Sequence, residues 1–335
     1  MSNWYTVPAP ENDIAVSTRI RLARNLEKLP FPARMTDQQR KELNAQVKKA
    51  IEESNTPFAK SLKYINMSDV PQNEIAAMVE RHVISPEFAA NPAERAIILS
   101  PDESISVMIG EEDHVRIQVI LGGLQLEKAY DLAEQLDSLL FASLHFAYDE
   151  RIGFLTECPT NLGTGLRASV MLHLPVLNSG GEIRQLTDSV AKIGFTVRGM
   201  YGEGTKASAS MFQISNQITL GITEKNAIDN LKIVTMQILE KERAARNGLK
   251  RIKLEDMCYR ALGILQNCRM CSSEEMMNDL SAVQLGVSMG ILKTKLPPIQ
   301  LLIEGQPHML MKKYGAADAD ERDIYRAEFL RDSLL

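Results

Sequence analysis

The sequence has few of the features that mark secreted, membrane-bound or nucleic-acid-binding proteins. Four cysteines in 335 residues are too few for a disulfide scaffold. No apolar run approaches the roughly 20 residues of a membrane-spanning helix, and residues 1–10 show no basic stretch followed by an apolar one. The formal net charge is −5, whereas surfaces that bind nucleic acid are basic. We therefore expect a cytoplasmic protein with neither a membrane nor nucleic acid as its direct partner.

The sequence also lacks the common phosphate-binding loops. There is no Gly-Lys-Ser/Thr, which excludes a Walker loop. Gly163-x-Gly165-x-x-Ala168 fits the dinucleotide pattern, but the Rossmann version stands between a strand and a helix. Here the run 158–161 precedes the glycines, and a β-like run over 168–174 follows them. A nucleotide site in this chain has to be built in another way.

The spacing of apolar residues predicts an α+β domain followed by an all-α domain. Residues 14–22 alternate as a half-buried strand does, and Thr36-x-x-Gln39 is a capping box for a helix that runs to residue 53. Short β-branched runs predict further strands, and the short turns favour antiparallel pairing. These runs are 96–99, 105–109, 116–121, 154–155, 167–174, 196–198 and 210–215, with helices over 126–146 and 182–193.

From residue 224 onward the helical period dominates. It predicts helices over 224–247, 253–268, 273–285 and 318–331. We place the boundary so that residues 1–250 form the α+β domain and residues 251–335 form the helical one. A helical domain of this size is expected to dock on its own core domain or on a second copy of the chain.

Arginine recurs at the ends of the predicted strands. In the first strand Ser17, Arg19 and Arg21 alternate with apolar residues and therefore share one face. The planar guanidinium matches phosphate oxygens in pairs and stays charged. Any one of these arginines alone is more typical of a solvated surface residue, but together they would form a triphosphate site without a Walker loop. The full set is Arg19, Arg21, Arg24, Arg116, Arg167 and Arg198.

Carboxylates stand next to several of these arginines. Glu111 and Glu112 lie in an acidic turn before Arg116, and Glu203 lies in a glycine-rich segment after Arg198. A guanidinium substrate needs acceptors for its N–H groups, and a carboxylate can also take the proton that an attacking nitrogen loses. The plain alternative is a solvated acidic turn.

The cysteines allow two readings. Cys158 precedes a proline, and adjacent arginines would favour its thiolate, although an isolated cysteine is more often a small buried apolar residue. Cys268-x-x-Cys271 has the spacing of half a zinc site, but no second pair or histidine lies nearby in the sequence. We expect this pair to be structural.

Four of these motifs, in this order, resemble those of the guanidino (phosphagen) kinases. Residues 17–24 resemble their Ser-x-Arg-x-Arg-x-x-Arg strand, and residues 111–116 match Glu-Glu-Asp-His-x-Arg. Residues 158–168 are similar to their reactive-cysteine segment, and residues 198–203 resemble Arg-Gly-x-x-Gly-Glu. The resemblance covers about residues 14–245 and implies the fold of guanidino kinases and glutamine synthetase, an antiparallel sheet flanked by helices.

The resemblance also assigns roles. Glu112 and Glu203 would hold the substrate guanidinium, with Glu112 the expected base, Glu111 beside it and Cys158 next to the substrate. Magnesium would arrive with the nucleotide, held by phosphate and water rather than by a protein metal site. The residues implied to contact ATP are Ser17, Thr18, Arg19, Ile20, Arg21, His82, Arg116, Arg167, Ala168, Ser169, Val170, Met171, Arg198, Gly199, Met200, Tyr201, Gly202 and Glu203.

One difference and one further match favour the branch of bacterial protein arginine kinases. Kinases of small guanidino compounds carry a helical domain before the first motif, whereas here the first motif begins near residue 14. In addition, Arg322, Asp323, Arg326 and Ala327 fit the Arg-Asp-x-x-Arg-Ala motif of a regulatory phosphoarginine pocket in that branch. The branch implies a homodimer formed through the C-terminal domain, the activator McsA, the repressor CtsR as a substrate, and delivery of marked proteins to the ClpC–ClpP protease.

Two alternatives stay open at this point: a kinase for a small guanidino metabolite, and a catalytically silent adaptor that only binds ATP or phosphoarginine. The complete set of Glu112, Glu203 and arginines argues against the adaptor. The early position of the first motif argues against the metabolite kinase, because it predicts a more open substrate site.

Overall fold

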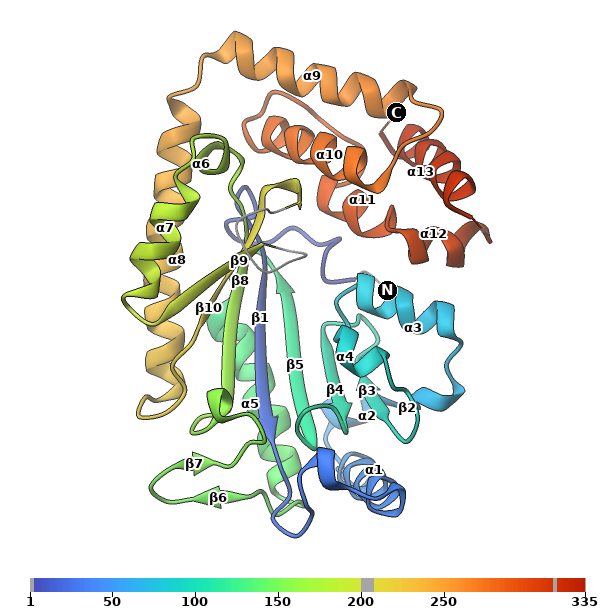
Figure 1. Ribbon diagram of the computed structural model, residues 1–335, viewed down its shortest axis with the longest axis vertical. Helices are drawn as coiled ribbons and strands as arrows, with labels where there is room; N and C mark the ends of the chain where they lie inside the picture. Colours follow the sequence, from blue (N-terminus) through green and yellow to red (C-terminus); the bar gives the residue numbers. More distant parts are fainter. Residues whose placement is uncertain (1–2, 200–207, 316–317, 335) are drawn as a thin grey trace.

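An eight-stranded antiparallel sheet forms the centre of the structure, and a group of helices lies across one end of it (Figure 1). The computed structural model describes residues 3–199, 208–315 and 318–334. The predicted α+β class, with a sheet flanked by helices and a helical C-terminal region, is confirmed.

The strands of the sheet lie in the order β2-β3-β4-β5-β1-β8-β10-β9, and neighbouring strands are antiparallel. The strand predicted over 14–22 is the central strand β1, Ala15–Arg24. The others are β2 Lys63–Asn66, β3 Ala96–Leu99, β4 Ile105–Ile109, β5 Val115–Gly122, β8 Leu166–His173, β9 Phe195–Gly199 and β10 Met211–Asn216. A separate two-stranded ribbon joins β6 Tyr148–Asp149 to β7 Gly153–Phe154.

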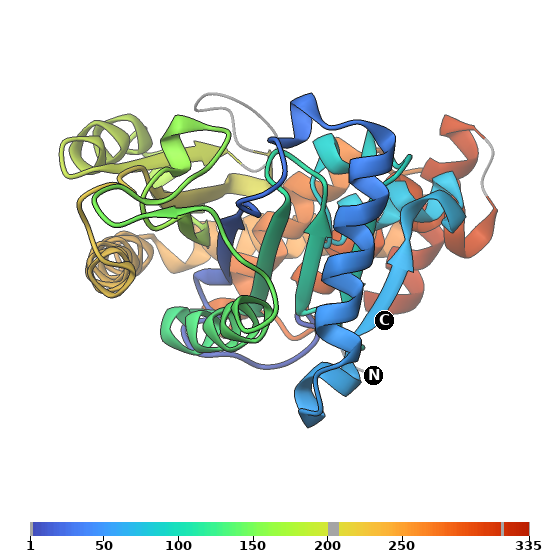
Figure 2. The same cartoon turned by 90° about the horizontal axis from the view of Figure 1, so that it is seen from below.

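Three long helices cover one face of the sheet: α1 (Asp37–Glu52), α5 (Leu126–Phe141) and α8 (Glu224–Asn247) (Figure 2). Their apolar stripes and the alternate strand residues Ile20, Leu22, Ile117, Val119, Ala168 and Val170 form the largest buried cluster. The capping box at Thr36 and Gln39 is present, and α8 has the predicted bounds. The shorter helices of this domain are α2 Pro57–Ser61, α3 Gln72–Glu80, α4 Pro86–Ala89, α6 Pro175–Ser179 and α7 Ile183–Ala191.

The C-terminal helices pack around a second buried cluster, which also contains Ala209 and Met211 of the first domain. They are α9 Arg251–Asn267, α10 Ser273–Ser288, α11 Pro298–Glu304, α12 Pro307–Tyr314 and α13 Ala319–Leu334. Short α11 and α12 were not predicted, because Pro297 and Pro298 interrupt the periodic pattern there. The contact between the domains includes Val16, which packs against this cluster. Strict alternation would place Val16 on the same face as Ile20, but the pairing register shifts between Ala15 and Ser17.

The contact between α12 and α3 is polar and specific. The Glu80 carboxylate accepts hydrogen bonds from the backbone N–H groups of His308 and Met309, at 3.0 and 2.9 Å. These are free N–H groups of the first turn of α12, so an acid from the first domain caps a helix of the second. Lys312, further along α12, donates to Glu74 of α3 at 2.5 Å. The two domains are therefore fixed to each other beside His82, two residues after Glu80.

Within the described part of the chain no helix is both long and apolar enough to cross a membrane.

Arg24, the last arginine of β1, is a structural residue. Its guanidinium is 2% exposed, donates to both carboxylate oxygens of Asp137 at 2.8–3.2 Å, and stacks on the Phe154 ring at 3.6 Å from the ring centre.

Replacing Arg24 with Met leaves Asp137 without its buried partner, and we expect the free energy of unfolding to fall by about 3 kcal/mol. Denaturant titration measures this, with Lys48→Met in the exposed Lys48–Glu52 pair as the control that changes stability by less than about 0.5 kcal/mol. Equal effects of the two substitutions would contradict this role.

Candidate functional site

One face of the sheet, free of the long helices, is lined by polar residues from adjacent strands. In an antiparallel sheet, directly paired residues point to the same face. Arg21 of β1 pairs with Arg167 of β8 and with Gln118 of β5, and Arg19 pairs with Ser169. Arg116 lies two residues from Gln118, and Arg198 of β9 pairs with Gln213 of β10 on the same side. The register therefore brings together the arginines that sequence spacing only suggested. We call Arg19, Arg21, Arg116, Arg167 and Arg198 the arginine face.

The charges on this face are not balanced. Arg19 has a hydrogen bond to the Gln213 amide oxygen at 2.6 Å, and Arg21 Nε is buried without a hydrogen-bond partner among the described residues. Burial, and after it the charges of Arg116 and Arg167, lower the pKa of Arg19 to about 10, and the pKa of Arg21 falls well below its usual range from burial and the neighbouring arginines. Guanidinium groups whose charged form is disfavoured by burial and by one another are typical of a site for a polyanion. The arrangement fits the triphosphate of a nucleotide.

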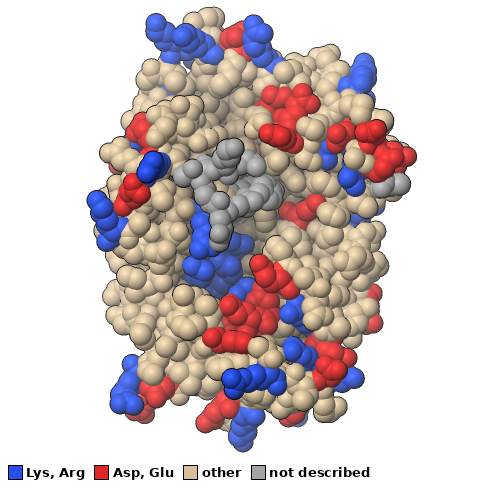
Figure 3. Space-filling view, in the orientation of Figure 1, with Lys and Arg blue, Asp and Glu red and all other residues tan. Residues whose placement is uncertain are grey.

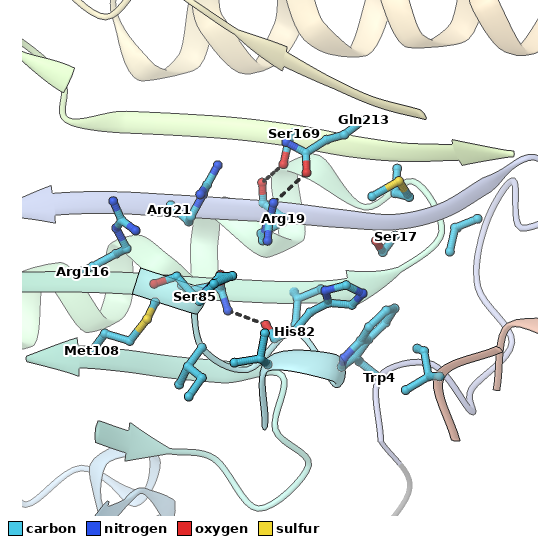
Figure 4. A pocket seen from close by; sticks show the side chains of 18 of the residues that line it. Trp4, Ser17, Arg19, Arg21, His82, Ser85, Met108, Arg116, Ser169 and Gln213 are labelled. Carbon is cyan, nitrogen blue, oxygen red and sulfur yellow. Dashed lines mark hydrogen bonds between the residues drawn. The ribbon is translucent and has the colours of Figure 1, made fainter. Parts of the chain in front are cut away.

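A cavity of about 300 Å³ opens on this face. In Figure 4 Arg21 and Arg116 lie at one end of it, Arg19 in the middle, and His82 and Trp4 at the other end. Burial, with a smaller contribution from Arg19, lowers the pKa of His82 to about 4, so this imidazole is neutral at neutral pH. His82 adopts a left-handed backbone (φ 61°), and Gln118 Nε2 donates to its carbonyl at 2.9 Å. The predicted residues Ser17, Ser169 and Met171 also line the cavity.

The carboxylates adjoin the phosphate end. Glu111 is buried and forms ion-pair and hydrogen-bond contacts with Arg116 and Ser85, whereas Glu112 is 41% exposed and accepts from Arg116 Nη2 at 3.1 Å. Arg116 is thus held by both acids and lies between them and the arginine face. Figure 3 shows a basic area in the middle of the molecule with an acidic area directly beside it.

Two further hollows extend the first cavity toward the surface. A small one of about 100 Å³ shares Arg21 and Arg116 with the large cavity and adds Arg167, Glu112 and Cys158. An open one of about 340 Å³ shares Glu112 and Cys158 with the small one and continues past Glu111. The three hollows form one line from Trp4 through the arginine face to Glu112 at the surface. We call it the transfer line.

The surroundings of Glu112 favour the protonated form of its carboxyl group. Burial raises the pKa of its carboxyl, and Asp113 and Glu111 add to this, while Arg116 opposes it. If Glu112 is the base, it must be ionised, so activity falls as pH drops through a pKa above the ordinary glutamate value. We expect the acid limb of a kcat/KM profile to lie above that value and to vanish in Glu112→Gln. A limb at the ordinary value of an exposed glutamate would contradict this assignment.

Several residues predicted to contact ATP lie elsewhere. Thr18, Ile20, Ala168 and Val170 are buried on the opposite face, since only every second residue of a strand presents its side chain to one face. A contact of these four residues with ATP would therefore have to involve their backbone atoms, and their assignment stays a prediction. Arg198 is exposed and Gly199 is buried at the end of β9, whereas Met200, Tyr201, Gly202 and Glu203 lie outside the described residues.

Cys158 lies on the transfer line, in the same small hollow as Glu112, and is partly exposed, with its Sγ 3.1 Å from the Thr160 hydroxyl oxygen. Gly165, in the segment that resembled a dinucleotide loop, leads directly into strand β8 and not into a helix. It has φ +62°, and an added Cβ would lie 2.6 Å from the Ala23 carbonyl oxygen. This glycine therefore serves close packing of the strands.

Sequence reasoning missed part of the cavity wall. Gln118 and Gln213 carry no charge and no motif of their own, but they alternate with residues already selected, and period-2 spacing would have found them. Trp4, Ile299 and Ile303 come from the two ends of the chain, and no local pattern places them here.

The C-terminal motif has a structural half and an accessible half. Arg326 is 1% exposed, donates to the backbone carbonyls of Gly305 and Cys271 at 2.8 and 2.6 Å, and pairs with Asp323. Ala327 is fully buried. Arg322 and Asp323 are only half-buried on α13. Only Arg322 and Asp323 of the motif therefore have side chains accessible to a ligand.

No cluster of three or more metal-ligating side chains occurs among the residues that the structure describes. The donors of the transfer line are mainly guanidinium groups, which repel a cation. Any magnesium here would be held by the phosphates of the nucleotide.

Comparison with known proteins places the same residues in a family context. Residues 42–245 match the ATP:guanido phosphotransferase C-terminal catalytic domain, and residues 251–335 match the protein-arginine kinase McsB C-terminal domain. The chain is 44% identical to a protein-arginine kinase of Halothermothrix orenii, over 100% of this chain and 97% of that one. It is 42% identical to the protein-arginine kinase of Bacillus subtilis, over 100% and 93%.

Solved structures agree on the fold. Lombricine kinase aligns with a TM-score of 0.62 at 22% identity, covering 74% of this chain and 71% of that one. The duplicated taurocyamine kinase of Schistosoma mansoni with bound transition state analog components aligns with a TM-score of 0.63 at 25% identity, over 82% and 41%.

Proposed function

The chain belongs to the ATP:guanido phosphotransferase family and, within it, to the protein-arginine kinases, and from this we propose that it transfers the γ-phosphate of ATP to arginine side chains of proteins. As a family member it is a kinase that uses ATP. The proposal concerns the acceptor, its partners and the way in which the described residues perform the transfer.

The observation that carries the proposal is the transfer line. Its phosphate end is half-buried and cationic, and its acceptor end opens at the surface beside Glu112, which is 41% exposed. An arginine side chain on another protein reaches such a site from outside, while the rest of that protein stays in solvent. An acidic entrance also attracts basic segments of a substrate.

The described residues have distinct roles in this reaction. Arg19, Arg21, Arg116 and Arg167 hold the phosphate oxygens, and Mg²⁺ bound to the nucleotide supplies further charge neutralisation. Glu112 accepts N–H hydrogen bonds from the substrate guanidinium and takes the proton that the attacking nitrogen loses. The phosphorus–nitrogen bond forms as the bond from the γ-phosphorus to the bridging oxygen breaks, and ADP leaves. Glu111 holds Arg116 in place, and Cys158 borders the acceptor guanidinium.

Incubation with ATP and Mg²⁺ in the presence of either an unfolded protein or free arginine tests the acceptor. We expect acid-labile label on arginine side chains of the protein, because phosphoramidates hydrolyse in acid, with at most slow labelling of free arginine. Label on free arginine alone would contradict the proposal and favour a kinase for a small guanidino metabolite. No label on either would favour the silent adaptor.

The wider assignment follows the same branch of the family. We propose a cytoplasmic enzyme that is activated by McsA, acts on the repressor CtsR and marks proteins for ClpC–ClpP. Four free cysteines suit a reducing compartment. A homodimer is supported by the exposed apolar side chains of α9, which are Ile252, Met257, Tyr259 and Ile264 at 42–72% exposure.

We also propose that Arg322 and Asp323 receive phosphoarginine, with Arg326 supporting the fold of the pocket. Arg322→Ala should then abolish the response of the kinase to added phosphoarginine while leaving the melting temperature unchanged. Arg326→Met should lower stability by about 3 kcal/mol, because it leaves two buried carbonyls without their charged donor. Activity titrated with phosphoarginine, together with thermal unfolding, separates the two effects. An unchanged response in Arg322→Ala would remove this pocket from the proposal.

A further inference from the structure

Two of the four cysteines meet in the C-terminal domain, away from the transfer line. Cys268 directly follows helix α9, and Cys271 stands two residues before helix α10, so both lie in the turn that joins these helices. Cys271 belongs to the second buried cluster, and Cys268 packs against it. Cys271 is 1% exposed, whereas Cys268 is partly exposed. The two thiols are hydrogen-bonded to each other, and only the first is open to solvent.

A structural metal ion does not explain the pair. Zinc takes four ligands, and no cluster of three or more metal-ligating side chains occurs in the part of the chain that the structure describes. Packing does not require this spacing either, since Cys258 is fully buried in the same cluster and has no cysteine three residues away. Two cysteines separated by two residues are instead the arrangement of dithiols that open and close a disulfide.

The two thiols have different acidities. Burial raises the pKa of the Cys268 thiol, but the hydrogen bond from Cys271 and the positive charge of Arg331 oppose this rise. Burial raises the pKa of Cys271 well above its usual range, and Cys268 adds to the effect. Cys268 is therefore the thiol that ionises first. Because it is also the more exposed of the two, an oxidant from solution meets Cys268 before Cys271.

Helix α13 is hydrogen-bonded to the backbone of both cysteines. Cys271 N–H donates to the Asp323 carbonyl at 3.0 Å, and Arg326 Nη1 donates to the Cys271 carbonyl at 2.6 Å. Arg331 donates to the Cys268 carbonyl. In Figure 1 α13 lies beside the turn between α9 and α10. A change in this turn therefore reaches the helix that carries the accessible side chain of Asp323.

We propose that Cys268 and Cys271 form a redox modification site, which hydroperoxides oxidise to a disulfide, and that α13 responds to the state of this site. The modification is independent of the kinase reaction. Its effect on ligand binding rests on the proposed role of Arg322 and Asp323 in receiving phosphoarginine.

The oxidation has two balanced steps. The Cys268 thiolate attacks the hydroperoxide, so that an S–O bond forms as the O–O bond breaks, and the other oxygen leaves as an alcohol or water after taking up a proton. The Cys271 sulfur then attacks the Cys268 sulfur and gives up its proton. The S–S bond forms as the S–O bond breaks, and water leaves. The two thiols lose two electrons, which the hydroperoxide gains, and a dithiol reductant reverses the change by exchange.

Disulfide formation moves the turn. The sulfur atoms of a disulfide are about 2.0 Å apart, much closer than two thiols that share a hydrogen bond. The backbone groups of Cys268 and Cys271 must shift to allow this, and these are the groups that bind α13. The hydrogen bonds to the Asp323 carbonyl and from Arg326 are therefore weakened in the oxidised protein.

Tryptic peptide mapping tests the site directly, because cleavage after Arg269 separates the two cysteines. The full-length protein is treated with hydrogen peroxide, alkylated under denaturing conditions and digested without reductant. We expect residues 261–269 to be joined to residues 270–293. The four cysteines fall in four different tryptic peptides, so the pairing is unambiguous. Protein treated with a dithiol should yield the same two peptides apart and alkylated.

Serine variants separate the roles of the two thiols. Cys271→Ser should stop the oxidation at a sulfenic acid on Cys268, which dimedone labels. Cys268→Ser should leave Cys271 reduced, and Cys258→Ala is the matched control in which the link still forms. A link that is missing when Cys158 is fully oxidised would overturn the inference. Faster oxidation of Cys271 than of Cys268 would also overturn it.

Hydrogen exchange and phosphoarginine binding test the response of α13 without measuring activity. In the oxidised protein, residues 319–334 should exchange their amide hydrogens faster. Phosphoarginine should bind at least about fivefold more weakly, the lower range of coupling between two sites. Peroxide should change neither quantity in Cys268→Ser, which keeps Cys158 and so controls for oxidation on the transfer line. Unchanged exchange of α13 in oxidised wild-type protein contradicts the response.

The redox site and the proposed function fail separately. If phosphoarginine binds neither form, the pocket on α13 is removed from the proposed function, while the peptide link and the faster exchange still support the redox site. If phosphoarginine binds reduced and oxidised protein equally and no link forms, the redox site is overturned and the pocket stands.

Discussion

Replacing Arg21 with Met is expected to abolish phosphotransfer and, at the same time, to stabilise the nucleotide-free protein. Arg21 is partly buried in the middle of β1, and its Nε is buried without a hydrogen-bond partner among the described residues. The charges of Arg19, Arg116 and Arg167 disfavour its protonated form, and Glu111 favours it. Methionine has similar length and no charge, so the substitution removes this unfavourable burial. We expect the free energy of unfolding to rise by about 1–2 kcal/mol.

The same substitution is expected to lower the rate of phosphotransfer, and this loss is much larger in free energy than the gain in stability. A positioned arginine that neutralises a phosphoryl group in transfer contributes about 10³-fold or more to turnover. Steady-state kinetics and thermal unfolding of Arg21→Met measure the two effects on one protein. Arg24→Met, three residues along the same strand, is the matched control for stability, since it should destabilise the fold through loss of the Asp137 pair. If Arg21→Met destabilised the protein as Arg24→Met does, Arg21 would be a structural residue and not part of a phosphate site.

Glu112→Gln is expected to lower the rate of phosphotransfer about 10²- to 10⁴-fold, the range associated with a general base. Glutamine keeps the size and one acceptor oxygen of glutamate but neither takes the proton nor balances the guanidinium charge. Arg116 remains held by Glu111, so the arginine face should keep its geometry. We therefore expect ADP affinity to stay within about twofold of wild type.

Single-turnover kinetics with ADP binding measured in parallel separates these two quantities. Glu127→Gln is a suitable control, because Glu127 pairs with Lys232 on the helical face of the molecule, away from the cavity. More than a tenth of wild-type turnover in Glu112→Gln would contradict its assignment as base. A large loss of ADP affinity would show instead that Glu112 supports the phosphate site.

The arginine face illustrates how a binding site opposes the stability of its own fold. Arg19 and Arg21 have lowered pKa values because burial and like charges disfavour their protonated forms. A fold that keeps these cations together before the ligand arrives needs no large reorganisation when the phosphates bind, which is the basis of electrostatic preorganisation. Arg24 and Arg81 show the contrasting case, since each is paired with carboxylates.

Local sequence was enough to predict the strand that carries the site but not the full wall of the cavity. Alternation in β1 placed Ser17, Arg19 and Arg21 on one face, and the register confirmed this. It did not separate Arg24 from them, because the partner that fixes Arg24 lies on α5, 113 residues further on. Burial and pairing of this kind depend on contacts across the fold, which local periodicity does not contain.

The same limit applies to the ends of the chain. Trp4 reaches the cavity because Gly122 and Gly123 let the N-terminal segment pass closely over β5, and Gly123 has a φ of +63° that favours glycine. Helix α11 was hidden by the two prolines at its start, although proline in the first turn is compatible with a helix. Neither element has a pattern that points to a nucleotide.

Mass spectrometric mapping of a protein substrate after incubation with ATP and Mg²⁺ tests the central claim most directly. Under conditions that preserve phosphoramidates, the account predicts phosphate on arginine side chains with the wild-type enzyme and, at equal times and enzyme concentrations, at least about 100-fold less with Glu112→Gln or Arg21→Met. Phosphate on serine or threonine, or equal arginine modification by wild type and both variants, would contradict it.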